Sequence, residues 1–225
     1  MKRILTSLFL FAAVAVLGQS NFDYQTDFKK ILKQTKSQNS NLFYEKLLIR
    51  FEADDSTLLD SEVLALMIGF TDKVAYKPYD DLVIERDIYS LNDAAEYQKS
   101  LDLANTFLAT HPLSQQALIE KGYSCYKLGK MAESNSAMYK FRRIMKAMFY
   151  SGLGKDPNQP MFALGPADGQ NYILKNESAS IGTMGSGTDK NGNFLDILEA
   201  KYKNGTSQTF YFIVQHATDK MFIKD

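Results

Sequence analysis

The stretch from Asn92 to Phe149 constrains the fold of this chain most, because its apolar residues recur at intervals of three and four. That spacing places them on one face of a helix, and three consecutive segments of the stretch have it. We predict a first helix from Asn92, whose side chain suits an N-cap, to the break at Pro112, which has no backbone N–H. Gly129 is expected to end the second helix in the left-handed conformation that is common at helix ends.

The spacing of these features resembles a tetratricopeptide repeat, which is a helix pair of about 34 residues. Pro112, Gly122 and Gly129 stand where such a repeat places them, and "CYKLGKMAES" resembles its turn between helices. We expect Gly122 to let the two helices approach closely, with Tyr126 filling the space beside it. Ser134 stands where the repeat usually has Ala, and no second copy is apparent upstream. An ordinary helical bundle is therefore the alternative.

Three further helices are predicted ahead of this stretch from the same kind of spacing. A turn follows them at Tyr76-Lys77-Pro78-Tyr79, where a proline lies between tyrosines. We favour a structural role for this turn, with its rings packed on the helices, over an aromatic platform for a ligand. The three helices are expected over Asp23–Thr35, Asn41–Glu52 and Leu59–Phe70.

The chain beyond residue 150 is rich in glycine and in strand-like segments. Asn204-Gly205 favours a tight hairpin between the last two of them. We therefore predict an α+β fold, with an N-terminal helical layer that holds the tetratricopeptide-like helix pair, followed by a small antiparallel β-sheet. The predicted domains are a helical one over residues 19–150 and a β-rich region over residues 151–225. Strands are expected at Met161–Leu164, Tyr172–Leu174, Phe194–Tyr202 and Gln208–Gln215.

The N-terminus has the features of a secretory signal peptide. Two basic residues precede an apolar run from Ile4 to Leu17, and the small Gly18 follows it. We interpret residues 1–18 as a signal peptide that is removed on export. The run is too short for a typical membrane span, and no other segment approaches the required length. We predict an exported protein, periplasmic or extracellular, with no transmembrane segment after signal cleavage.

Charge and cysteine content exclude two further classes. The chain has 26 basic and 26 acidic residues, and loss of Lys2 and Arg3 with the signal peptide leaves 24 basic residues. That balance differs from the clustered basic surface that binds nucleic acid, so we predict no nucleic-acid partner. The single cysteine, Cys125, cannot form an intramolecular disulfide. Stability must therefore come from packing, for which a hydrophobic content of 45% is sufficient.

Two N-terminal segments, "FYEKLLIRFEADDSTL" and "GFTDKVAYKPY", are followed by "FLATHPLSQQAL" at the helix break and "SGLGKDPNQPMFAL" before the strands. In this order the chain resembles the Domain of Unknown Function family 4919, from Gram-negative bacterial envelopes. The resemblance covers nearly all of the mature chain and implies the same fold and export. It departs from the family's pattern at a Lys-Asp-Pro insert in "SGLGKDPNQP", and "PADGQNYIL" follows the usual strand only loosely. The resemblance implies no activity and no site residues, because none is established for the family.

Cysteine and metal chemistry have weak candidates. A cysteine nucleophile would need Cys125 together with His111 or His216, but Cys125 lies on an apolar helix face, where it behaves as a small hydrophobe. Two histidines and one cysteine without close spacing also make a poor zinc site. We therefore predict no cofactor.

A loop with alternating oxygen-bearing residues resembles the start of a calcium loop. It lacks the glutamate expected at the twelfth position, for which Asp196 is the nearest replacement, and an ordinary β-turn is the preferred alternative. The segment Gly182–Gly187 resembles a phosphate-binding loop without its Lys-Ser/Thr ending, so a flexible loop is expected there. The weak calcium candidates are Asp189, Asn191, Asn193 and Asp196.

The leading functional prediction is a non-enzymatic protein- or peptide-binding module of the cell envelope, with an unidentified partner. This prediction is based on the helix-pair pattern and on the lack of residues spaced as a catalytic site would require. We predict that tyrosines lying off the best apolar stripe of their helices line a groove between stacked helices. These residues are Tyr89, Tyr123 and Tyr139.

One alternative is a purely structural accessory unit, which differs from the binding module only in lacking a discrete groove. The other is an envelope hydrolase whose catalytic residues come together only in the folded β-rich region. It requires carboxylates that converge in a concave pocket, at least one of them with a strongly raised pKa. Its candidate residues are Asp168, Asp189, Asp196 and His216.

Overall fold

The protein is described by a computed structural model that covers residues 22–222. The predicted signal peptide, residues 1–18, lies outside the described residues. Seven helices form the N-terminal part, and the α+β prediction is confirmed. These helices are α1 (Tyr24–Thr35), α2 (Tyr44–Glu52), α3 (Asp60–Phe70), α4 (Asp81–Asp93), α5 (Tyr97–Leu108), α6 (Gln115–Lys127) and α7 (Met131–Ser151).

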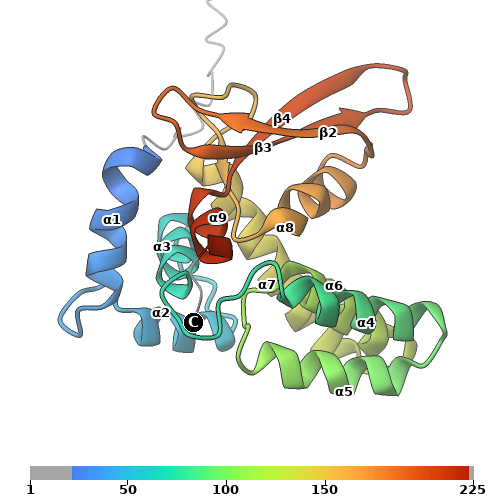
Figure 1. Ribbon diagram of the computed structural model, residues 1–225. Coiled ribbons are helices and arrows are strands. Elements are labelled where there is room, and N and C mark those ends of the chain that lie inside the picture. The colour runs from blue at the N-terminus through green and yellow to red at the C-terminus, as the bar shows by residue number, and fades with distance from the viewer. Residues whose placement is uncertain (1–21, 223–225) are drawn as a thin grey trace, which may run out of the picture.

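A four-stranded sheet with three short helical segments follows. The strand order is β1-β4-β3-β2, in which β1 runs parallel to β4 and the other two pairs are antiparallel. The sheet is thus mixed, and mainly antiparallel as predicted. Figure 1 shows it across one end of the molecule, above α8 and α9. The elements are β1 (Met161–Phe162), α8 (Pro166–Asn171), the π-helical turn η1 (Tyr172–Asn176), β2 (Ser180–Thr188), β3 (Phe194–Lys201), β4 (Ser207–Ile213) and α9 (Gln215–Phe222).

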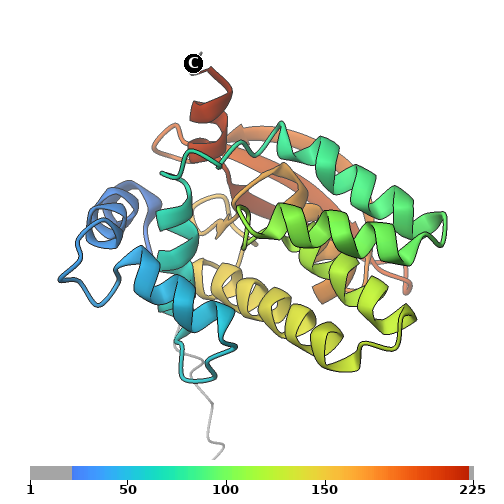
Figure 2. The ribbon, with the colours of Figure 1, turned by 90° about the horizontal axis from the view of Figure 1, so that it is seen from below.

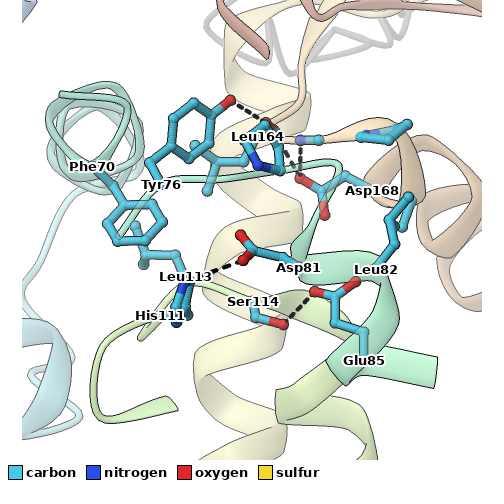
Figure 3. Close-up of a pocket in the computed structure, with 14 residues that line it drawn as sticks. Phe70, Tyr76, Asp81, Leu82, Glu85, His111, Leu113, Ser114, Leu164 and Asp168 are labelled. Carbon is cyan, nitrogen blue, oxygen red and sulfur yellow. Dashed lines mark hydrogen bonds and ion pairs between the residues drawn. The ribbon is translucent and has the colours of Figure 1, made fainter. Parts of the chain in front are cut away.

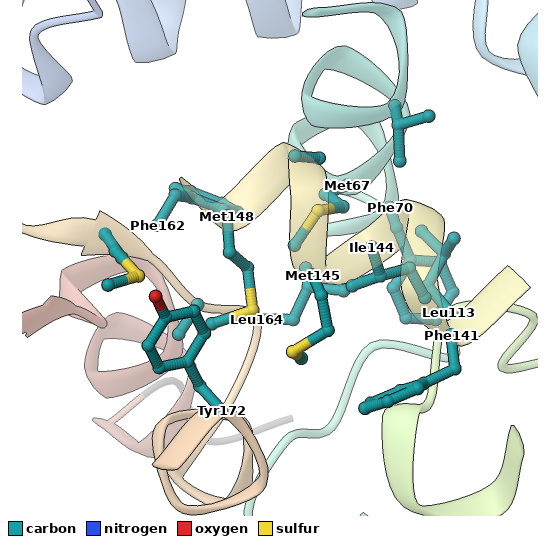
Figure 4. Close-up of a cluster of buried hydrophobic side chains, with 14 of the residues drawn as sticks. Met67, Phe70, Leu113, Phe141, Ile144, Met145, Met148, Phe162, Leu164 and Tyr172 are labelled. Atoms are coloured by element: carbon teal, nitrogen blue, oxygen red, sulfur yellow. The ribbon is translucent and has the colours of Figure 1, made fainter. Parts of the chain in front are cut away.

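Helices α3 and α7 form the centre of the core. Every residue of α3 from Val63 to Phe70 is buried, because α1, α2 and α7 all pack around this helix. Helix α7 has 21 residues and runs from the α6 side to β1, as Figure 2 shows from below. Figure 4 shows the apolar cluster that joins the helical part to the sheet. Its members include Met67, Phe70, Ile144, Met145, Met148, Phe162, Leu164 and Tyr172.

Several local predictions are confirmed. Helix α5 ends at Leu108, ahead of the predicted break at Pro112, and α6 follows it with Ser114 as its cap, whose hydroxyl accepts from the Ala117 N–H at 3.1 Å. Gly129 and Gly205 have φ angles of 75° and 85°, the left-handed values expected at a helix end and a hairpin turn. The Tyr76 ring is buried, and its hydroxyl donates to the Leu164 carbonyl, which supports the structural role of the turn.

The prediction that Asn92 caps a helix is wrong. Asn92 lies in the last turn of α4, a helix that we did not predict, and α5 begins only at Tyr97. The buried Asn92 amide donates to the Glu120 carboxylate at 2.7 Å and accepts from the Ser124 hydroxyl at 2.7 Å. These partners on α6 satisfy the amide inside the core, so tertiary packing overrides its capping preference.

Three further local predictions are corrected. Residues 172–174 form a π-helical turn instead of a strand, because the chain continues directly from α8. The expected flexible loop at 182–187 lies within strand β2, since its backbone pairs with β3. Tyr126 is 58% exposed and does not fill the space beside Gly122. Met138 lies there, with its Sδ 2.8 Å from where a Cβ of residue 122 would be.

The helix pairs α4–α5 and α6–α7 repeat the same hydrogen bonds at an offset of 34 residues. The Ser100 hydroxyl donates to the Ile88 carbonyl at 3.0 Å, and Ser134 donates to the Gly122 carbonyl at 2.7 Å. At the turn between the helices, Ala95 has a φ of 59°, where the second pair has Gly129. We call α4–α5 the first helix pair and α6–α7 the second. The two helix pairs therefore share this turn conformation and these hydrogen bonds, although no second copy is apparent in the sequence.

Candidate functional site

A small pocket lies where the first helix pair meets α8 (Figure 3). Its volume is about 40 Å³, room for about one or two water molecules and too little for an organic substrate. Its polar lining comes from α4 and the turn before it, from the segment before α6 and from α8. The titratable side chains in it are Tyr76, Asp81, Glu85, His111 and Asp168.

Asp168 stabilises the start of α8. Its Oδ2 accepts from the Leu164 N–H at 2.8 Å and from the Gly165 N–H at 3.2 Å. Burial, and then the nearby Glu85, raise the pKa of the Asp168 carboxyl to about 7. The hydrogen bonds to two backbone donors explain its place in the fold without any ligand.

The other pocket groups also have intramolecular partners. Ser114 Oγ donates to Glu85 Oε1 at 2.6 Å, while burial raises the pKa of Glu85 to about 7. His111 Nε2 lies 3.3 Å from Asp81 Oδ1. Burial opposes protonation of His111, but the hydrogen bond and charge of Asp81 raise its pKa above the usual value. In the described part of the chain no hydrogen bond joins the His111 ring to the Ser114 hydroxyl, so these residues do not form a nucleophile–base pair.

A second region, on the surface of the second helix pair, contains tyrosines around one lysine. The Tyr123 ring packs edge-on against Tyr97 of α5, with ring centroids 5.9 Å apart and an interplanar angle of 78°. Lys127 Nζ lies 5.3 Å from the Tyr123 ring centre and 5.8 Å from that of Tyr97. Such distances allow cation–π attraction. Tyr123, and then Tyr97 and Tyr126, raise the pKa of Lys127, which keeps it cationic.

We call Tyr97, Tyr123, Tyr126 and Lys127 the tyrosine–lysine cluster. Tyr123 is 43% exposed, and Tyr126 is the more exposed of the two. Within residues 22–222, Lys127 forms no ion pair with a carboxylate. Part of this cluster could be predicted from the sequence, because Tyr123 and Lys127 are four residues apart on one helix and therefore lie on the same face. Tyr97 joins them only through the packing of α5 on α6.

The comparisons with known proteins give a family without an activity. The model of the family described as "Domain of unknown function (DUF4919)" matches residues 29–222. The chain belongs to this family. No curated protein and no solved structure matches it. The family model confirms the resemblance to family 4919. Because no relative of known function matches, the candidate site is inferred from the geometry of its residues.

The three tyrosines predicted to line a groove lie apart in this DUF4919 protein. Tyr89 is on α4, with 49% of its surface exposed, and Tyr123 is on α6 in the tyrosine–lysine cluster. Tyr139 is on α7, where its hydroxyl donates to the Asp55 carbonyl at 3.4 Å. Among the described residues no ring contact joins any two of the three. Tyr123 is the one with an aromatic neighbour on the surface.

The hydrolase candidates are also spread over the fold. Asp168 lies in the pocket, whereas Asp196 is on β3, where burial raises its pKa to about 6. His216 is stacked on Phe162 with ring centroids 4.4 Å apart, and burial lowers its pKa to about 3, so the ring is neutral. Between residues 22 and 222, no hydrogen bond or ion pair links any two of Asp168, Asp189, Asp196 and His216.

Three of the calcium-loop candidates, Asp189, Asn191 and Asn193, lie in the turn between β2 and β3, whereas Asp196 is on β3. Asp189 Oδ1 accepts from the backbone N–H groups of Asn191 at 2.8 Å and Asn193 at 2.9 Å. The Asn193 side-chain amide also donates to Asp189 Oδ2, at 2.8 Å. The Asp189 carboxylate thus organises the turn. Within the described residues no group of three or more His, Cys, Asp or Glu side chains is arranged to hold a metal ion.

Proposed function

We propose that this DUF4919 protein is an exported, non-enzymatic module of the bacterial cell envelope that binds a protein or peptide through its helical part. The tyrosine–lysine cluster is the observation that carries the proposal. Tyrosine is one of the residue types that contribute most to protein interfaces, and here exposed tyrosines are grouped around a lysine and held by a neighbouring ring.

The two helix pairs support the same proposal. Their hydrogen bonds recur after 34 residues, which is the length of a tetratricopeptide repeat, and we propose that they are repeats of this kind. Stacked helix pairs commonly present extended surfaces to partner proteins.

The state of the pocket favours binding over hydrolysis. Its carboxyls and its histidine are each engaged by groups of the fold, and its volume suits water alone. Export is proposed from the signal-peptide pattern in residues 1–18 and from the family resemblance. Within residues 22–222, none of the helices has the length and apolarity that crossing a membrane requires.

The test is in-cell crosslinking of the tagged protein in its native envelope, followed by purification and mass spectrometry. The double variant Tyr123→Ala/Tyr126→Ala removes the exposed rings of the cluster, and Tyr89→Ala is the matched control on α4. We expect one reproducible partner that is lost in the double variant and kept in the control, at an unchanged melting temperature. A partner that survives in the double variant, or no partner in any sample, would contradict the proposal.

A further inference from the structure

The second helix pair carries a set of cations without counter-ions. Lys140 pairs with Asp54 at 2.9 Å, and Arg143 with Asp60 at 3.2 Å. Other cations of this helix pair and its turn form no ion pair with any described carboxylate. They are Lys121, Lys127, Lys130, Arg142 and Lys146.

Lys127 is the member of this set whose surroundings have the form of a binding site. It lies in the last turn of α6, where the helix dipole favours a cation but supplies no counter-ion. Its neighbours are the rings of Tyr97 and Tyr123, which attract the ammonium group by cation–π interaction. A hydrogen bond to the Tyr123 hydroxyl occupies one of its three N–H donors, and the others are available to a ligand.

The polar groups of the cluster are hydrogen-bond donors. The hydroxyls of Tyr97 and Tyr126 form no hydrogen bond within the described residues, and the Tyr123 hydroxyl lies beside Lys127. An ammonium group next to phenol hydroxyls matches a carboxylate, which accepts hydrogen bonds and carries the opposite charge. The exposed Tyr123 face offers apolar contact to a side chain next to that carboxylate.

We infer that the tyrosine–lysine cluster binds an acidic peptide segment, with one of its carboxylates paired to Lys127 and a flanking side chain packed on Tyr123. This inference rests on the proposed binding function and names the chemistry of its ligand. A single carboxylate needs only the Lys127 position.

The experiment is selection of a phage-displayed random 12-residue peptide library on the mature protein at low salt. We expect the enriched peptides to hold more Asp and Glu than the input library. Synthetic copies of one enriched peptide, with its acids or with the matching amides, are then compared by fluorescence anisotropy. We expect the amides to bind at least tenfold more weakly, and binding of the acidic peptide to weaken with added salt.

The variants assign the effect to one side chain. Lys127→Gln should weaken binding of the acidic peptide about tenfold, Lys127→Glu should abolish it, and Lys127→Arg should retain it. Lys33→Gln removes the same charge from the last turn of α1, across the molecule in Figure 1, and should leave binding unchanged. Enriched peptides without excess acid, or equal binding to Lys127→Gln, would overturn the acidic ligand and leave the binding module standing. The acidic-peptide inference would also be overturned if no peptide were enriched, or if the oligonucleotide (dT)12 bound more tightly than the acidic peptide. In either case the crosslinking experiment tests separately whether the protein binds a partner.

Discussion

The two helix pairs build the same turn from different residues. In the second pair Gly129 takes the left-handed conformation, with a φ of 75°, whereas in the first pair Ala95 takes it with a φ of 59°. A left-handed alanine costs roughly 1 kcal/mol or more relative to glycine. The bond from the Glu96 N–H to the Leu91 carbonyl and its counterpart from Lys130 to Cys125 are both 2.8 Å long. The turn is therefore held by its hydrogen bonds and packing, and glycine makes it easier without being required.

The pairs also differ in what surrounds them. Helix α4 of the first pair directs the partly buried Glu85 into the small pocket against α8, where the Ser114 hydroxyl donates to it. Helix α6 of the second pair presents Tyr123 and Lys127 on the surface, without a carboxylate partner in the described chain. The first pair thus uses a carboxyl of α4 inside the fold, whereas the second pair, which also packs on α8 and β1, carries its tyrosines and lysine on the surface.

The largest expected difference is at the helix contact. Ile88 of the first pair is fully buried, and its counterpart in the second pair is Gly122. Ile88→Ala should lower the free energy of unfolding by about 2 to 5 kcal/mol, because it leaves a cavity. Gly122→Ala should change it by less than about 1 kcal/mol, since the helix gain offsets the shift forced on the flexible Met138 side chain. Urea denaturation measures the free energy of unfolding of both variants. Equal losses would show that the two helix pairs do not differ at this contact.

The pocket should give the first pair a pH dependence. Burial raises the pKa of Glu85 from 4.5 to about 7, so its contribution to stability is full below pH 4.5 and is lost as the pH rises through 7. Relative to the Glu85→Gln variant, the wild type should lose about 1 to 3 kcal/mol between pH 4.5 and pH 7.5. Urea denaturation over this range measures the difference. The neutral His216 acts in the opposite direction but is common to both proteins and cancels. If the free energies of unfolding of the wild type and of Glu85→Gln changed in parallel with pH, Glu85 would titrate as an exposed carboxyl does.

The repeated serine bonds should be equivalent. Ser100→Ala and Ser134→Ala each remove one buried hydrogen bond to a helix carbonyl, and each should cost about 1 kcal/mol. Thermal unfolding monitored by circular dichroism is sufficient to compare them. If only one of the two substitutions lowered stability, the two hydrogen bonds would share a geometry but would not contribute equally to stability.

The turn residues should respond in opposite directions. Ala95→Gly relieves a left-handed alanine and should raise stability by about 0.5 to 1 kcal/mol, whereas Gly129→Ala should lower it by a similar amount. The melting temperatures of the two variants provide the measurement. If Ala95→Gly is destabilising, contacts of the alanine methyl group contribute more than the backbone conformation does.

The smallest effect on stability is expected in the tyrosine–lysine cluster. Lys127→Gln should change the free energy of unfolding by less than about 0.5 kcal/mol, because it changes an exposed side chain without an ion-pair partner. The measurement is the same urea titration as for Ile88→Ala. A larger loss would mean that Lys127 is part of the fold and would weaken its assignment to binding.

The sequence alone determined the local elements and the family. Periodic apolar residues located α1, α2, α3, α6, α7 and, apart from its start, α5, and Asn204-Gly205 located the hairpin, because these signals act within one or two turns of chain. The segments from "FYEKLLIRFEADDSTL" to "SGLGKDPNQPMFAL" were enough to recognise the family. The turn at Gly129 was also predictable, since glycine is the usual residue there.

Only the tertiary structure decided which residues meet. Alanine disfavours the left-handed conformation of Ala95, so neither the turn between α4 and α5 nor α4 itself was predicted from the sequence. Asn92 prefers a cap in isolation, but the buried Glu120 and Ser124 hold it inside a helix. Glu85 and Asp168 come from distant parts of the chain, and Tyr97 reaches Tyr123 only because α5 packs on α6. Contacts of this kind depend on how whole elements pack, which short-range propensities do not contain.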